Sequence, residues 1–340
     1  MMHHHKIQRL VLLLFSCFLL HCSAPVWQKV DLAQRQGNLE SAAQELETYL
    51  KTNPNDAKAY YQLGEIRGQQ GYWEQMLQAL KICDSLGSRW QAETANAREF
   101  YWAINIDNGL DAQKNSDYAN ATAYFQTAVK ILPENASGQR LLGEAAVKAN
   151  QPGIAKTALE AALRLNPKDY RARRLAMRIY FNQGDFQKTL AAAQILENSF
   201  SKDTEALRFT AYSLDKLDKK VDAAGAYERL IDLSASAQDV QVFAAFRFRC
   251  GEYDKAIELS RQAITLDGRK TISNLRAIAQ MQLMKKEFSS VIETANEILA
   301  IQPDDVAALQ LKQVSHAALG QQQALEIISH RIKEIKAGTE

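Results

Sequence analysis

Arginines recur at a fixed interval in the middle of the sequence, and their chemistry suits the binding of an anionic group. Arg140, Arg174 and Arg208 follow one another at equal spacing. Arg171 and Arg178 lie three residues before and four residues after Arg174, which places them on the same face of a helix. A planar guanidinium binds a carboxylate or a phosphate through two parallel hydrogen bonds. The pattern predicts a surface that binds an acidic segment or the C-terminus of a peptide.

The same residues also allow a second interpretation, in which the arginines are paired within the chain. Glu144 follows Arg140 by four residues, a spacing that favours an ion pair on one helix. A row of arginines neutralised in this way would be a solvated face and would bind no ligand. The sequence leaves both interpretations open.

Motifs typical of enzymes are missing from the sequence. It contains no G-x-x-x-x-G-K-[ST] loop, no H-E-x-x-H and no G-x-S-x-G. After residue 22 the only histidines are His316 and His330, and no cysteine pair has the spacing of metal ligands. We therefore expect no enzyme activity, no cofactor and no bound metal.

The composition is that of a folded helical protein with balanced charge. The chain has 340 residues, of which 46% are hydrophobic and 24% charged, with 15 glycines and 6 prolines. Low glycine and proline content favours an all-α fold. The net charge is +2, and it comes from the segment that precedes Cys22. Because the rest of the chain is neutral, we expect no binding to nucleic acid.

The N-terminus predicts export. A basic segment precedes the apolar run LVLLLFSCFLL at residues 10–20, which is too short to span a bilayer and suits the core of a signal peptide. The run ends in Leu-Leu-His-Cys-Ser at residues 19–23, which resembles a bacterial lipoprotein signal. That resemblance implies cleavage after residue 21 and a lipid on Cys22. Cys17 is the weaker alternative, and an ordinary or uncleaved signal stays open. Ser23 at the next position implies the outer membrane.

The elements that position the arginines form a repeated unit, clearest at Ala136–Asp169. Its apolar residues predict two helices, with Gly143 and Ala155 small enough to let them cross closely. Pro152 suits the first turn of the second helix. One such hairpin cannot bury its own apolar faces, so it requires stacked neighbours on both sides.

Residues suited to cap helices repeat with the same period as the arginines. From Asn135 onward the spacing from one such residue to the next is nearly constant. The predicted caps are Asp56, Asn135, Asp169, Asp203, Ser236, Thr271 and Asp305.

These units resemble the tetratricopeptide repeat family, whose pattern W-x2-L-G-x2-Y…A-x3-F…P recurs about every 34 residues. The unit after Asp56 carries Tyr60-x2-Leu63-Gly64, and a later one carries Ala121, Phe125 and Pro133. The resemblance implies an all-α, right-handed α-solenoid of eight to nine units. Residues 22–340 would be one continuous array with degenerate end units, preceded by a signal peptide at residues 1–21.

The resemblance also implies which residues line the binding groove. In such arrays the fifth residue after each first-helix cap points inward. These residues are Tyr61, Arg140, Arg174, Arg208, Gln241, Arg276 and Gln310. The candidate partner-binding set is therefore Arg140, Arg171, Arg174, Arg178, Arg208, Arg276 and Tyr61.

The N-terminal third is rich in aromatic residues and contains an insertion near Gln91–Tyr101, relative to the regular spacing of the units. We expect Trp90–Lys114 to form one long helix, with a possible break at Asn108-Gly109. Most of the aromatic side chains fall at core positions, but Tyr61 and part of the long helix could offer a patch to a partner.

The function implied is a non-enzymatic scaffold that binds protein or peptide partners in the bacterial cell envelope. It would be a lipid-anchored protein facing the periplasm, and it would assist assembly of an outer-membrane, pilus or cell-wall complex. Two alternatives remain: an accessory or regulatory subunit of an envelope hydrolase, and a receptor for glycans or anions.

Overall fold

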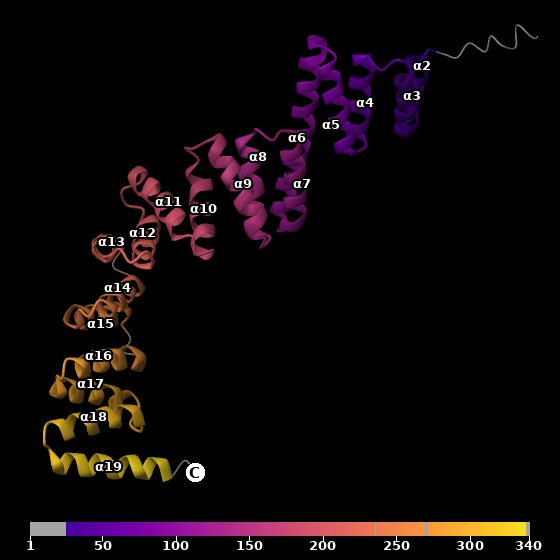
Figure 1. Ribbon diagram of the computed structural model, residues 1–340. Helices are drawn as coiled ribbons and strands as arrows, with labels where there is room; N and C mark the ends of the chain where they lie inside the picture. The colour runs from indigo at the N-terminus through magenta and orange to yellow at the C-terminus, as the bar shows by residue number, and fades with distance from the viewer. Residues whose placement is uncertain (1–24, 235, 269–270, 338–340) are drawn as a thin grey trace, which may run out of the picture. The chain divides into compact units, whose positions relative to one another are not determined.

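The protein is helical throughout the part of the chain that the structure describes. The computed structural model describes residues 25–234, 236–268 and 271–337, in which it contains α-helices, one short 3-10 helix and no strand. The helices form two compact units, unit 1 ending at Asp169 and unit 2 beginning at Tyr170 (Figure 1). No helix within those ranges is both long enough and apolar enough to cross a bilayer. The predicted signal peptide, with Cys17 and Cys22, lies outside the described residues.

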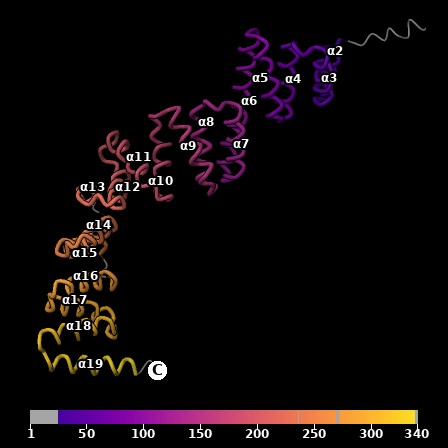
Figure 2. The backbone as a smooth tube through the Cα atoms, viewed as in Figure 1, coloured from indigo at the N-terminus to yellow at the C-terminus, as the bar shows by residue number. Residues whose placement is uncertain are grey.

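Unit 1 contains four consecutive helix pairs (Figure 2). Each helix contacts the next along the chain, so the pairs stack in sequence order. The helices are α2 (Val26–Arg35), α3 (Leu39–Thr52), α4 (Ala57–Gln69), α5 (Trp73–Ser85), α6 (Gln91–Lys114), α7 (Tyr118–Ile131), α8 (Ala136–Lys148) and α9 (Pro152–Leu165).

Unit 2 contains five pairs built in the same way. They are α10 (Tyr170–Asn182), α11 (Phe186–Ser199), α12 (Thr204–Lys216), α13 (Lys220–Ser234), α14 (Ala237–Arg249), α15 (Tyr253–Asp267), α16 (Ile272–Met284), α17 (Phe288–Ile301), α18 (Val306–Ala318) and α19 (Gln322–Ala337). The stacked helix pairs confirm the predicted all-α solenoid class, and the described residues hold nine pairs, the upper of the two predicted numbers.

The predicted caps determine where the first helices begin. Asp56, Asn135, Asp203, Ser236, Thr271 and Asp305 each accept a hydrogen bond from the backbone N–H three residues later. Asp169 directly precedes α10. Three second helices are capped in the same way by Asn38, Asp117 and Asp185, which the sequence analysis did not single out.

Close helix crossings depend on glycine in three of the pairs. A Cβ atom on Gly143 would lie 2.5 Å from Cγ of Leu159, so only glycine fits where α8 crosses α9. Gly64 meets Leu80 and Gly109 meets Phe125 in the corresponding way. The prediction that Gly143 permits close crossing is confirmed, and Leu159 is fully buried beside it.

The insertion forms the start of a long helix, as predicted. A 3-10 turn at Ser88–Trp90 leads directly into α6, which runs for 24 residues without the break considered at Asn108-Gly109. The first half of α6 packs on the preceding pair, where the ring of Tyr101 fills the space left by Gly68. The hydroxyl of Tyr101 donates to the carbonyl oxygen of Glu65 at 2.9 Å.

Candidate partner-binding surface on the first helices

The first helix of each regular pair presents two residues at fixed distances from its cap. They follow the cap by five and nine positions, so they lie four residues apart on one helical face. We call this surface the first-helix face. It consists of Tyr61 and Glu65 on α4, Arg140 and Glu144 on α8, Arg174 and Arg178 on α10, Arg208 and Tyr212 on α12, Gln241 and Ala245 on α14, Arg276 and Gln280 on α16, and Gln310 and Val314 on α18.

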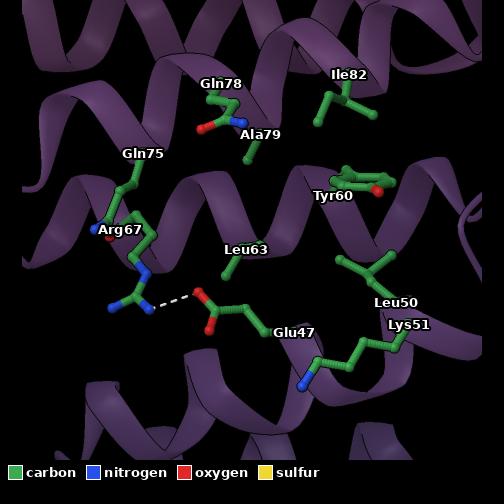
Figure 3. A pocket seen from close by; sticks show the side chains of 10 residues that line it. All are labelled: Glu47, Leu50, Lys51, Tyr60, Leu63, Arg67, Gln75, Gln78, Ala79 and Ile82. Carbon is green, nitrogen blue, oxygen red and sulfur yellow. Dashed lines mark hydrogen bonds and ion pairs between the residues drawn. The ribbon is translucent and has the colours of Figure 1, made fainter.

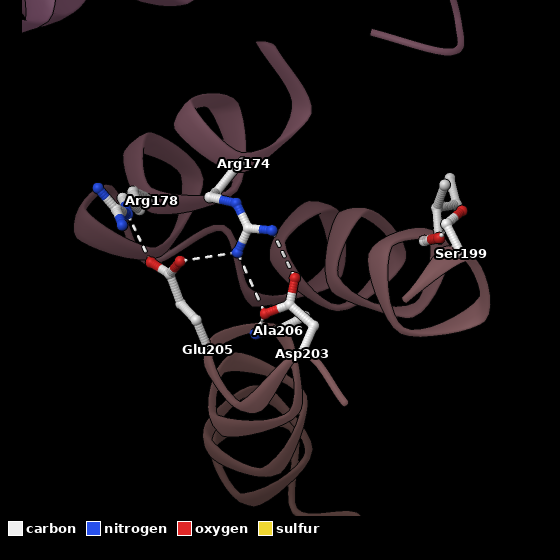
Figure 4. Close-up of polar contacts among 7 residues, drawn as sticks. Arg174, Arg178, Ser199, Asp203, Glu205 and Ala206 are labelled. Carbon is white, nitrogen blue, oxygen red and sulfur yellow. Dashed lines mark hydrogen bonds and ion pairs between the residues drawn. The ribbon is translucent and has the colours of Figure 1, made fainter. Parts of the chain in front are cut away.

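Arg174 binds two carboxylates of the following repeat (Figure 4). Its Nη2 lies 2.5 Å from Oδ2 of Asp203, and its Nη1 lies 2.9 Å from Oε2 of Glu205. Arg178 donates from Nε to the other oxygen of Glu205 at 2.6 Å. Asp203 also accepts the backbone N–H of Ala206. One carboxylate therefore caps α12 and binds the arginine of the preceding first helix.

The other arginines of the first-helix face are engaged in the same way. Arg208 donates to both oxygens of Asp239, at 2.6 and 2.8 Å. Arg276 binds Asp305, which is the cap of α18. The side chains of the acceptors Asp239 and Asp305 are only 2% and 1% exposed, so in each pair a partly exposed arginine binds a buried carboxylate.

Arg140 in unit 1 combines both kinds of contact. It lies 2.6 Å from Glu144 on its own helix, and its Nε lies 3.3 Å from Oδ2 of Asp169. The pairing of Arg140 with Glu144 that the sequence allowed is therefore present.

The contacts of Arg174 with Asp203 and of Arg208 with Asp239 shift the pKa values of both partners. The hydrogen bond to Asp203 raises the pKa of Arg174, although burial opposes it. Burial alone would raise the pKa of Asp203 and Asp239, but the hydrogen bonds from Arg174 and Arg208 leave both below their ordinary values. The carboxylates are therefore ionised at neutral pH and compensate the arginines.

The structure thus shows internal pairing for the arginines at 140, 174, 178, 208 and 276. Arg171 is exposed in the first turn of α10. An acidic ligand would have to displace a carboxylate that is already desolvated and hydrogen-bonded. Binding of an acidic segment stays a prediction, and the contacts favour a structural role in which these arginines join successive repeats.

Two adjoining hollows open on the first-helix face of unit 2. One, of about 110 Å³, lies between α14 and α16 and is lined by Gln241, Phe248 and Met281. The next, of about 330 Å³, lies between α16 and α18 and is lined by Leu283, Gln310, Leu311 and Val314. Gln280 lines both hollows. We call the two together the glutamine trough, defined by Gln241, Phe248, Gln280, Leu283, Gln310 and Val314.

The trough combines apolar side chains with amides. A glutamine side chain both donates and accepts hydrogen bonds, as a peptide group does. The Oε1 atom of Gln241 is buried and has no hydrogen-bond partner within the described residues. Gln241 and Gln310 occupy positions that the family resemblance implies to face inward, but glutamine by itself is not diagnostic of a binding role.

A larger pocket of about 450 Å³ lies between α3, α4 and α5 of unit 1 (Figure 3). Arg67 on its wall is 5% exposed and binds Glu47 at 2.6 Å and Glu40 at 2.8 Å. Arg247 in unit 2 also binds two glutamates, Glu228 on the preceding helix α13 and Glu252 at the start of α15. Two buried arginines at the same repeat position, each bound to two glutamates, fix neighbouring helices to each other.

The described residues form no group suited to hold a metal ion. Residues 25–234, 236–268 and 271–337 include no group of three or more His, Cys, Asp and Glu side chains that could hold a metal ion. His316 contacts Gln321, and the exposed His330 lies 3.3 Å from Glu334 on the same helix.

Comparison with known proteins finds similarity over parts of the chain. A tetratricopeptide repeat family model matches residues 28–74 and 140–197. Among curated proteins, the chain is similar to the cellulose synthase operon protein C of Xanthomonas axonopodis pv. citri (strain 306), at 25% identity over 154 residues. The match covers 45% of this chain and 10% of that protein, so the chain spans about a tenth of the length of this relative.

The chain is also similar to several solved structures. The crystal structure of the MamA protein is 18% identical, with 49% of this chain and 92% of that chain covered and a TM-score of 0.46. The Pseudomonas aeruginosa pilF structure is 13% identical, covering 65% and 99%, with a TM-score of 0.43. The P58(IPK) TPR domain is 16% identical, covering 88% and 89%, with a TM-score of 0.33. The two stretches that match the tetratricopeptide repeat model include α4 and most of α8, whose caps Asp56 and Asn135 are described above.

Proposed function

We propose that this protein is a non-enzymatic scaffold that binds a segment of another protein in the glutamine trough of unit 2. The observation that carries the proposal is the pair of adjoining hollows that share Gln280. Together they offer apolar surface from Phe248, Leu283 and Val314 beside amide groups on three successive first helices. Tetratricopeptide repeats commonly serve protein–protein interaction, which agrees with this use of the surface.

The expected ligand is an apolar, uncharged polypeptide segment. Apolar side chains would bury area against Phe248 and Val314, while the glutamine amides would pair with backbone N–H and C=O groups. Arg276 at the edge of the trough is already bound to Asp305, so it adds little attraction for an acidic group. The stacked helix pairs are ordered before binding, so most of the conformational entropy lost would be that of the ligand.

We further propose that the scaffold works in the bacterial cell envelope, held at a membrane by a lipid on Cys22. The support is the basic N-terminus, the short apolar run and the Leu-Leu-His-Cys-Ser ending. A role in assembling an outer-membrane, pilus or cell-wall complex follows as the corresponding proposal.

Photocrosslinking tests the binding surface. A photoreactive phenylalanine analogue would be placed at Gln280, or at Ile327 as the control. Both residues are exposed in unit 2, but Ile327 lies on α19 outside the trough. After irradiation of cells, we expect a discrete crosslinked product from position 280 only. Mass spectrometry should map the crosslink to an uncharged, apolar segment of one partner.

A substitution in the trough tests the same proposal while the crosslinker stays at position 280. Val314→Asp would place a charge in the larger hollow, and Ile327→Asp would place the same charge elsewhere. With the crosslinker at position 280, the first change should reduce the product at least about tenfold and the second should not. Equal products from all three proteins, or a crosslink mapped to an acidic segment, would contradict the proposal.

A further inference from the structure

Glu65 is the carboxylate of the first-helix face that lacks the cation found at its repeat equivalent. On α8, Glu144 pairs with Arg140, four residues earlier, at 2.6 Å. The same two positions on α4 are occupied by Glu65 and Tyr61. The Oε1 atom of Glu65 is buried and has no hydrogen-bond partner within the described residues. An aromatic ring therefore stands where the arginine would be, and the carboxylate is left uncompensated.

The insertion before α6 brings a second aromatic residue and a second carboxylate to this place. Trp90 ends the 3-10 turn and stacks on Tyr61, with ring centroids 5.2 Å apart and an interplanar angle of 22°. Glu93 follows Trp90 by three residues in the first turn of α6. Its Oε2 atom is also buried without a hydrogen-bond partner in the described part of the chain.

Arg89 of the chain itself lies 6.0 Å from the centroid of the Trp90 ring, and the chemical group that would complement the two buried carboxylate oxygens is an organic cation. Two carboxylates repel an anionic ligand, and the faces of stacked aromatic rings attract a positive charge. Two carboxylates without a third ligand make a poor metal site, and no group of three metal-ligating side chains occurs in the described ranges. A guanidinium or ammonium group can stack on the rings and bind the carboxylates at once.

We propose that Tyr61, Glu65, Trp90 and Glu93 form a receptor site for a basic side chain, arginine above all, of a partner protein. All four residues are half-buried, so each keeps some surface for a ligand. Within the chain, the pair of Arg140 with Glu144 shows how a guanidinium meets a glutamate at these repeat positions. The site lies in unit 1, whereas the glutamine trough lies in unit 2, so the two are different sites. The site would bind a cation, whereas the arginine row would bind an anion.

Titration with matched peptides tests the charge requirement. The probes are acetyl-Gly-Arg-Gly-amide and its citrulline counterpart, which has nearly the same shape without the charge. The signal is the indole N–H resonance of Trp90 in the full chain, identified by its loss in Trp90→Phe. The arginine peptide should shift this resonance in a saturable way, and the citrulline peptide should bind at least about tenfold more weakly. Equal binding of the two peptides would overturn the proposal.

Three variants separate recognition from folding. Glu65→Gln should weaken the arginine peptide at least about tenfold, whereas Glu99→Gln, on the exposed side of α6, should leave it unchanged. Tyr61→Arg rebuilds the α8 arrangement, so it should abolish peptide binding while the melting temperature stays equal or rises. Unchanged binding in Glu65→Gln or in Tyr61→Arg would refute the site. A saturable shift with magnesium ions, and none with the arginine peptide, would also refute it.

Discussion

Arg174 and Asp203 join two successive repeats through a carboxylate that has two roles. Asp203 caps α12 through the N–H of Ala206, and it accepts a hydrogen bond from Arg174 Nη2 at 2.5 Å. The residue that starts one repeat is therefore fixed by the first helix of the repeat before it. Arg276 and Asp305 repeat this relationship at the same separation of 29 residues.

Loss of one such arginine should destabilise unit 2. In Arg208→Gln, Asp239 would keep its hydrogen bonds from Ser234 and Ser236 but lose its counter-ion while only 2% exposed. We expect a loss of about 2 kcal/mol in the free energy of unfolding, measured by urea denaturation. Arg178→Gln is the control, because the Arg178 side chain is 52% exposed and its loss should cost at most about 1 kcal/mol. A loss of unfolding free energy in Arg208→Gln that is no larger than the loss in Arg178→Gln would contradict this role of Arg208.

Acid should weaken the contact between Arg174 and Asp203. The pKa of Asp203 is below its ordinary value of 3.8, because the hydrogen bonds from Arg174 outweigh the effect of burial. A group with a lowered folded-state pKa contributes stability that is complete above the unfolded pKa and is lost as pH falls through the folded pKa. The melting temperature should therefore fall steeply below about pH 4. Asp203→Asn should start from a lower melting temperature and show a shallower decline, and an unchanged slope would contradict this origin.

The crossing of α8 and α9 should tolerate no side chain at Gly143. In Gly143→Ala the new Cβ would lie 2.5 Å from Leu159, so Leu159 or the helix must move, at a cost of about 1–3 kcal/mol. Gly153→Ala is the matched control, since nothing lies within 4 Å of its added Cβ and α9 is helical there. That change should be neutral or stabilising by up to about 1 kcal/mol. Thermal melting of the two variants would compare them, and the opposite ranking would refute the packing argument.

Cys22→Ala should release the protein from membranes if the proposed lipid anchor is present. The variant should lose incorporation of a labelled fatty acid and should be insensitive to globomycin, which blocks lipoprotein processing. Cys17→Ala is the control and should keep both the fatty-acid labelling and the sensitivity to globomycin. Labelling that survives Cys22→Ala but disappears in Cys17→Ala would move the anchor to Cys17, and labelling of neither protein would refute a lipid anchor.

Much of the fold was predictable because it depends on interactions between residues near in sequence. A cap such as Asn135 bonds to the N–H three residues later, and Gly143 permits a crossing within one hairpin. The regular spacing of the caps follows from repetition of such local units. The uninterrupted course of α6 through Asn108-Gly109 was not fixed in this way, because Gly109 packs against Phe125 of the next helix and is held in the helix by that contact.

The sequence by itself determined the helix pairs, their caps and the row of arginines, since each of these follows from residue type and periodicity. Only the tertiary structure decided what Arg174, Arg208 and Arg276 do, because their partners are carboxylates 29 to 31 residues away in the next repeat. The spacing from each arginine to the following cap was visible in the sequence, but that spacing does not show which way two side chains point. The stack of Tyr61 on Trp90 and the uncompensated carboxylates beside it depend on how the insertion folds back onto α4. That placement is set by packing between helices, which the order of residues in one chain segment does not reveal.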